Sequence, residues 1–150
     1  MLGNVDPVRS VLIPIMGTEM LLPNSAIAEI INYQSPEEVD GAPDWVVGSI
    51  NWRGRQLMLI SVEKLMGLET PSTDVGKRIS VLNRVNAEAR QEFYAMVTAG
   101  IPHLVRLKEG DVQLEDRTST HDLVREDVTV QAKAAFIPNM DYLEGMVNKL

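Results

Sequence analysis

Residues 48–68 read GSINWRGRQLMLISVEKLMGL, and this stretch decides the fold. Two short apolar runs lie on either side of Arg53-Gly54, which is the pattern of two strands joined by a tight turn. One amphipathic helical turn follows and ends at Gly67, because glycine commonly closes a helix. The run Leu57–Ile60 is apolar at every position. A strand there must be buried on both faces, so we expect it between two packed units.

Further strands are predicted before and after this stretch from their apolar patterns. They are Val8–Met16, Met20–Leu22, Ile27–Ile31, Arg78–Arg84, Glu92–Thr98, His103–Leu107, Val128–Ala132 and Ala134–Ile137. The segment Thr70–Gly76 has turn-forming residues and no apolar period, which predicts a connector between two halves near residues 70–77. The segment Lys108–Asp127 is rich in acidic residues, and we expect most of it to be solvated loop.

A helix is predicted at the C-terminal end of the chain, after Pro138-Asn139. Its apolar residues recur at i, i+3, i+4 and i+7, which gives one face that can pack on a sheet. These residues are Leu143, Met146, Val147 and Leu150. Elsewhere, Trp45 is expected in the core, and Met16, Met58 and Met96 are expected to fill it because they lie in strand patterns.

Composition excludes several classes of protein. The chain has 150 residues, 45% of them hydrophobic, which suits one domain with a real core but gives no run long enough to span a membrane. It has no cysteine and no signal-peptide pattern, so we expect a cytoplasmic protein without disulfides. The formal net charge of −7 disfavours nucleic acid and anionic lipid as partners.

Catalytic patterns are missing from the sequence. The two histidines, His103 and His121, have no second ligand at a metal-binding spacing, so we expect neither a metal nor another cofactor. The residues Ser119-Thr120-His121-Asp122 include the types found in a catalytic triad, but neighbours in sequence cannot adopt its geometry. We therefore expect a protein that is not an enzyme.

The order of the pieces in residues 48–68 resembles the core motif of CheW-like domains, a family of non-catalytic adaptors in bacterial chemosensory arrays. The resemblance extends upstream, where Ile27–Tyr33 is similar to the family's strand with a glutamate between apolar residues. Ala42–Gly48 is similar to the approach into the glycine-bearing strand. Within the motif, Trp52 stands where leucine is common and Met58 stands where proline is common.

The resemblance implies a mainly-β fold in which residues 1–150 form one CheW-like domain of two SH3-like five-stranded β-barrel subdomains with a C-terminal helix. It also implies a function: coupling a methyl-accepting chemoreceptor to a CheA-type histidine kinase, near membrane-associated arrays and without membrane insertion. The departures from the motif indicate a divergent paralogue, and we expect a system that controls type IV pili and twitching motility.

The resemblance assigns partner binding to Arg53, with Glu29 orienting it, and places Ile27 and Gly48 along the same groove. From the residues alone, Arg53 is equally consistent with a turn residue paired to an acid, and Gly48 with a close backbone approach. Trp52 beside Arg53 is either an exposed interface anchor or a core residue. It is included among the expected partner-binding residues.

Two other functions remain as alternatives at this point. One is a small-molecule-binding or enzymatic β-barrel, for which the sequence supplies no catalytic constellation. The other is a homo-oligomeric structural protein that uses exposed strand edges. A metabolite that raised the melting temperature would favour the first, and light scattering would reveal the second.

Overall fold

The computed structural model describes residues 8–68, 70, 73–116 and 121–150, which form eleven strands, two α-helices and one 3-10 turn. The strands are β1 (Val8–Ile15), β2 (Thr18–Pro23), β3 (Ile27–Asn32), β4 (Val46–Trp52), β5 (Arg55–Ile60), β6 (Arg78–Asn83), β7 (Phe93–Thr98), β8 (His103–Leu107), β9 (Val112–Leu114), β10 (Val124–Val130) and β11 (Lys133–Pro138). The helices are α1 (Val62–Leu65) and α2 (Met140–Asn148), and η2 (Asn24–Ala26) lies between β2 and β3.

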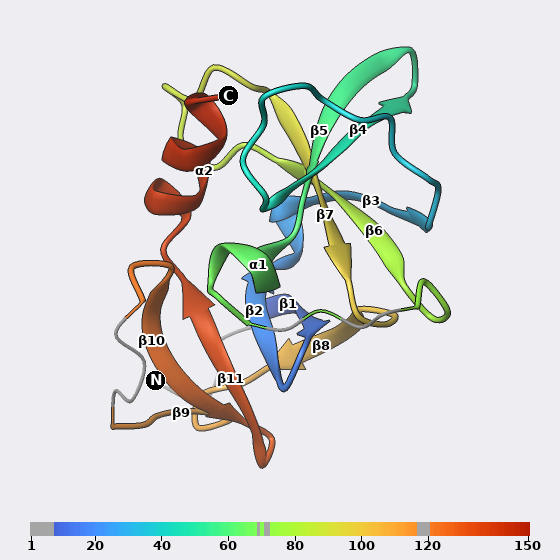
Figure 1. The fold of residues 1–150 in the computed structure, drawn as a ribbon. Coiled ribbons are helices and arrows are strands. Elements are labelled where there is room, and N and C mark those ends of the chain that lie inside the picture. Colours follow the sequence, from blue (N-terminus) through green and yellow to red (C-terminus); the bar gives the residue numbers. More distant parts are fainter. Residues whose placement is uncertain (1–7, 69, 71–72, 117–120) are drawn as a thin grey trace.

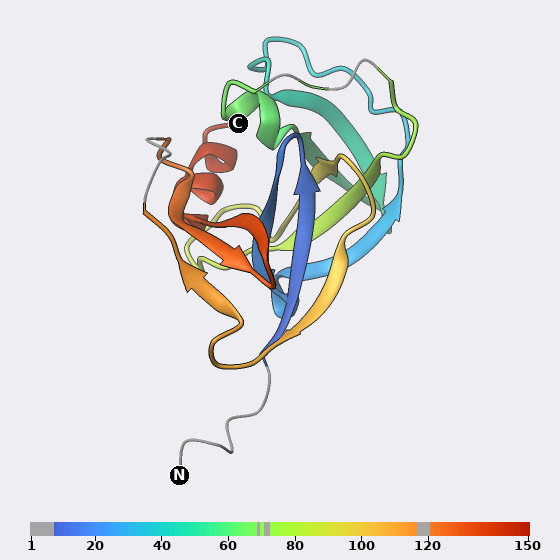
Figure 2. The ribbon, with the colours of Figure 1, turned by 90° about the horizontal axis from the view of Figure 1, so that it is seen from below.

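The strands form two sheets, which Figure 1 shows as two lobes with α1 between them. One sheet has six strands in the order β8-β1-β2-β11-β10-β9, and the other has five in the order β3-β6-β7-β5-β4. Figure 2 shows the β1–β2 hairpin between β8 and β11 of its own sheet. The predicted mainly-β fold with a C-terminal helix is confirmed. The six-stranded sheet exceeds the expected five because β9, inside the expected acidic loop, pairs with β10.

The two sheets are not the two halves of the sequence. The predicted connector near residues 70–77 follows α1 and precedes β6, so it joins two strands of the same five-stranded sheet. The chain changes sheet after β2 and again after β7. The expectation was wrong in this respect because turn-forming residues mark a loop without indicating which sheet the next strand joins. Residues 71–72 of this segment lie outside the described residues.

The β4–β5 hairpin forms as the sequence predicts. Trp52 pairs with Arg55 across a two-residue turn, and both turn residues have positive φ, 49° at Arg53 and 77° at Gly54. Positive φ at both central positions is the type I′ geometry that matches the twist of a hairpin. Further along β5, Leu59 packs in the core of its own sheet and Ile60 packs in the core between the sheets. This strand is therefore buried on both faces, as expected.

The helix α2 docks through the predicted face. Leu143 and Val147 are buried in the central core, and Met146 and Leu150 pack against it. The Asn139 side chain accepts a hydrogen bond from the Tyr142 backbone N–H and so caps the helix. Neither helix in the described part of the chain has the length and apolar character needed to cross a membrane.

The other core predictions have mixed outcomes. Trp45 and Met96 are buried in the central core, and Met58 packs against it. Met16 is 44% exposed, so its predicted core position is wrong. The strand β1 ends at Ile15, which leaves Met16 in the turn that leads to β2.

Candidate partner-binding site

The tip of the β4–β5 hairpin presents Arg53 to solvent beside Glu29 of β3. Arg53 Nη2 lies 3.1 Å from Glu29 Oε1, and the arginine side chain is 69% exposed. The Arg53 guanidinium carbon also lies 5.0 Å from the centroid of the Trp52 ring, within the range of a cation–π contact. The structure thus brings together the two residues that the resemblance pairs, and it holds the guanidinium on an aromatic surface.

Trp52 lies beneath Glu29 and donates a hydrogen bond to it. The residue is 8% exposed and packs in the core of the five-stranded sheet, so the core alternative for Trp52 is correct. Its Nε1–H donates to Glu29 Oε1 at 2.9 Å, the same oxygen that pairs with Arg53. Any contribution of Trp52 to partner binding therefore acts mainly through the positions of Glu29 and Arg53.

The remaining predicted site residues have structural roles. Ile27 is half-buried and packs against the central core at the start of β3. At Gly48 a Cβ atom would overlap the Glu37 carbonyl oxygen, because the Glu37 and Ser49 backbones exchange hydrogen bonds of 2.9 and 2.8 Å there. Gly48 is therefore required for a close backbone approach. The groove-lining role expected for both Ile27 and Gly48 stays a prediction.

A second arginine lies next to this pair, and sequence reasoning missed it. Arg55 Nη1 donates to Glu92 Oε2 at 2.9 Å, and its guanidinium carbon lies 5.0 Å from the centroid of the Phe93 ring. The Phe93 and Trp52 rings are themselves 4.9 Å apart, tilted by 58°. No local pattern could link Arg55 to Glu92, because 37 residues separate them in sequence.

Six residues form one surface around the two arginines, and we call this surface the arginine cluster. They are Glu29, Trp52, Arg53, Arg55, Glu92 and Phe93, drawn from β3, the β4–β5 hairpin and the start of β7. The cluster contains two guanidinium groups and two carboxylates around a pair of packed aromatic rings. Such a surface can bind charged or carbonyl groups of another protein, since arginine combines planar hydrogen bonding with stacking.

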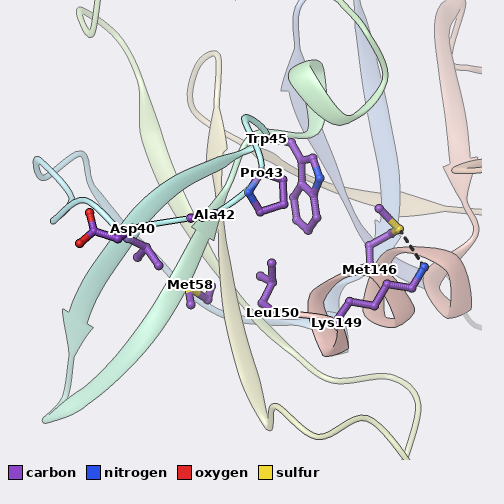
Figure 3. Close-up of a pocket in the computed structure, with 10 residues that line it drawn as sticks. Asp40, Ala42, Pro43, Trp45, Met58, Met146, Lys149 and Leu150 are labelled. Atoms are coloured by element: carbon purple, nitrogen blue, oxygen red, sulfur yellow. Dashed lines mark hydrogen bonds between the residues drawn. The ribbon is translucent and has the colours of Figure 1, made fainter.

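A separate cavity of about 410 Å³ lies between the loop before β4 and the end of α2 (Figure 3). Trp45, Met58 and Leu150 are among its apolar lining residues. Lys149 lies at its edge, with its Nζ 4.0 Å from Met146 Sδ. This cavity shares no lining residue with the arginine cluster. It is large enough for a small molecule, but it offers few positioned polar groups to orient one.

Two buried titratable groups have raised pKa values. Burial raises the pKa of Glu63, partly offset by the charge of Lys77. Burial also raises the pKa of Tyr94 well above its ordinary value, and the neighbouring Glu144 adds to the rise. Within the described residues, no group of three or more His, Asp or Glu side chains is arranged to hold a metal ion.

The His121 side chain, in the predicted loop, contacts Leu123, Tyr142 and the Leu65 backbone carbonyl, whose oxygen lies 3.0 Å from His121 Nε2. The His121 Nδ1 accepts the Leu123 backbone N–H at 3.0 Å, and its ring packs edge-on against Tyr142 at 5.7 Å between centroids. Residues 119 and 120, which complete the triad-like run, lie outside the described residues.

Comparison with known proteins shows the family of the chain and its fold. The family model for the CheW-like domain matches residues 9–144. Among solved structures, the chain is similar to the scaffolding protein TtCheW from Thermoanaerobacter tengcongensis, with a TM-score of 0.75 and 16% sequence identity. That match covers 93% of this chain and 88% of the other, and at this identity it shows the shared fold. No curated protein matches the sequence.

Proposed function

We propose, from the premise that the chain belongs to the CheW-like domain family, that it is a non-catalytic adaptor in bacterial chemosensory signal transduction. Proteins of this family act as scaffolds between chemoreceptors and the CheA kinase. By this proposal the chain couples a methyl-accepting chemoreceptor to a CheA-type histidine kinase through protein contacts, with no bound cofactor. It acts as one CheW-like unit in the cytoplasm and is recruited to membrane-associated receptor arrays.

The observation that carries the proposal is the Glu29–Arg53 pair. A largely exposed guanidinium is held in place from two sides, by a carboxylate at 3.1 Å and by a buried aromatic ring. An exposed ion pair contributes only about 0–1 kcal/mol to stability, so the contact of the Arg53 guanidinium with Glu29 adds little to folding. Arginine is enriched among the residues that dominate protein interfaces, and a guanidinium that is already held in place loses little freedom when a partner binds.

We further propose that the chain is a divergent paralogue that serves type IV pili and twitching motility rather than flagellar chemotaxis. The departures within residues 48–68 support this assignment, above all Trp52 in place of the common leucine. This replacement creates the indole N–H that fixes Glu29 in the structure.

The adaptor role is tested with Arg53→Asn. Asparagine tolerates positive φ and Asn-Gly is a favoured type I′ turn, so the hairpin should form at least as well as in the wild type. The free energy of unfolding should therefore change by less than about 1 kcal/mol, the range expected for losing an exposed ion pair. Affinity for the receptor or kinase encoded in the same genome, measured by isothermal titration, should fall at least about thirtyfold, as expected for a loss of 2 kcal/mol.

Two further variants complete the test. Glu29→Gln keeps an oxygen that can accept the Trp52 N–H but removes the charge that pairs with Arg53, so it should weaken binding less than Arg53→Asn does. Arg125→Ala removes an exposed arginine from β10 in the other sheet and should bind as the wild type does. Wild-type affinity in a folded Arg53→Asn protein would show that the adaptor function does not depend on this site.

A further inference from the structure

The arginine cluster contains two arginines that are held in the same way. Each has its guanidinium carbon 5.0 Å from an aromatic centroid, Arg53 over Trp52 and Arg55 over Phe93. Each also has one terminal nitrogen within 3.1 Å of a glutamate oxygen. Because the two rings pack on each other, the two guanidinium groups share one aromatic support.

This arrangement leaves N–H donors of the Arg55 guanidinium exposed to solvent. The Arg55 side chain is 54% exposed and its partner Glu92 is similarly exposed. The contact with Glu92 uses one nitrogen of a group that carries five N–H donors. A stacked guanidinium also loses little side-chain freedom when a partner binds, because its orientation is already restricted.

Carboxylates are the groups that such donors bind best. A planar guanidinium can give a carboxylate two parallel, charge-assisted hydrogen bonds, which are stronger than those to a neutral carbonyl. Two guanidinium groups on one aromatic support therefore favour a partner segment with acidic side chains over one that offers only backbone oxygens.

We propose that Arg55 is a second partner-contact residue, and that Arg53 and Arg55 together bind a protein segment that carries acidic side chains. This inference rests on the proposed adaptor function and names the chemistry of the partner. The Trp52–Phe93 pair supports both guanidinium groups, and Glu29 and Glu92 set their orientation. The two glutamates are positioning residues, and the two arginines make the contact.

The test compares Arg55→Ala, Arg55→Lys and Arg125→Ala with the wild type, using isothermal titration against the partner that binds the wild type. We expect Arg55→Ala to lower affinity about tenfold or more, as an interface arginine does. Lysine keeps the charge but lacks the planar fork, so Arg55→Lys should recover only part of the loss. Arg125→Ala should have no effect, and the melting temperatures of all three should match the wild type.

Salt dependence identifies the chemistry of the partner group. If Arg55 meets a carboxylate, affinity should fall less steeply between 50 and 300 mM NaCl in Arg55→Ala than in the wild type, because one screened charge pair is missing (Debye length about 10 Å at 0.1 M). An unchanged slope together with weaker binding would overturn the acidic-partner assignment. Glu92→Gln provides a second variant that leaves Arg55 in place, and it should weaken binding mildly.

The outcomes separate this inference from the proposed function. Wild-type affinity in Arg55→Ala combined with lost binding in Arg53→Asn would overturn the inference and leave the adaptor role intact. Wild-type affinity in both variants would overturn the inference and show that the adaptor function uses another surface. Failure of the wild type to bind either the receptor or the kinase would overturn the adaptor function itself. If Arg55→Ala does not fold, wild-type affinity in both Glu92→Gln and Arg55→Lys would overturn the contact role of the guanidinium.

Discussion

The carboxylate of Glu144 offers the sharpest test of how α2 is held in the structure. Glu144 is 1% exposed, although it belongs to a helix on the outside of the lobes. Its two oxygens accept the backbone N–H groups of Val85 and Asn86, each at 2.7 Å. The Tyr94 hydroxyl donates to the same carboxylate at 3.1 Å. The helix thus fixes the loop between β6 and β7.

Glu144→Ala should remove about 3–5 kcal/mol from the free energy of unfolding. Tyr94 is fully buried, so its hydroxyl would keep no partner, which costs about 1–3 kcal/mol. The two backbone N–H groups each lose a bond to a charged acceptor but lie next to exposed loop residues, where water can replace part of it. We assign about 1 kcal/mol to each of these two bonds.

A double-mutant cycle with Tyr94→Phe separates the contributions. Phenylalanine removes the hydroxyl, so Glu144→Ala in that background leaves no buried O–H without a partner and should cost less than in the wild type. Urea denaturation followed by circular dichroism gives the free energies for the cycle. Equal costs of Glu144→Ala in the two backgrounds would refute the account of the Tyr94 hydroxyl.

Hydrogen exchange checks the loop independently. The Val85 and Asn86 amides should be protected in the wild type and exchange much faster in Glu144→Ala, because the carboxylate is their acceptor. Unchanged protection would mean that something other than Glu144 holds the loop. The loop leads to Glu92, whose backbone carbonyl accepts the Arg84 N–H, so its loss should also disturb the Arg55 contact.

Local patterns in the sequence predicted most of the elements, because neighbouring residues decide them. The Arg53-Gly54 turn and the buried β5 strand follow from residue types and periodicity alone. The strand β9 was missed because only Val112 and Leu114 stand out from an acidic segment, and its pairing with β10 depends on distant residues. The assignment of strands to sheets was missed for the same reason.

The candidate site was only partly predictable. The resemblance supplied Glu29 and Arg53, but Arg55 had no visible partner because Glu92 and Phe93 follow a loop whose path the sequence does not reveal. Glu144 reads as a solvated helix residue, since its burial arises only when the loop covers it. Long-range contacts therefore determine the features that the sequence could not show.

Two further predictions concern buried side chains on the helices. Leu143→Ala should lower the free energy of unfolding by about 2–5 kcal/mol because Leu143 is fully buried, and Met146→Ala should lower it less because Met146 is half-buried. The midpoints of urea denaturation measure both effects. Midpoints equal to that of the wild type would mean that α2 is not docked as described. The last prediction concerns pH. Burial raises the pKa of Glu63 above its ordinary value of 4.5 in the folded protein, with the charge of Lys77 opposing the rise. The folded state therefore binds this proton more tightly than the unfolded state, and the associated stability, complete below pH 4.5, is lost as the pH rises through the folded-state pKa. Glutamine at this position does not titrate, so the stability of Glu63→Gln relative to the wild type should increase from pH 4.5 to pH 7. Other titrating groups act on both proteins alike, and a stability difference that stayed constant over this range would show that Glu63 is not desolvated.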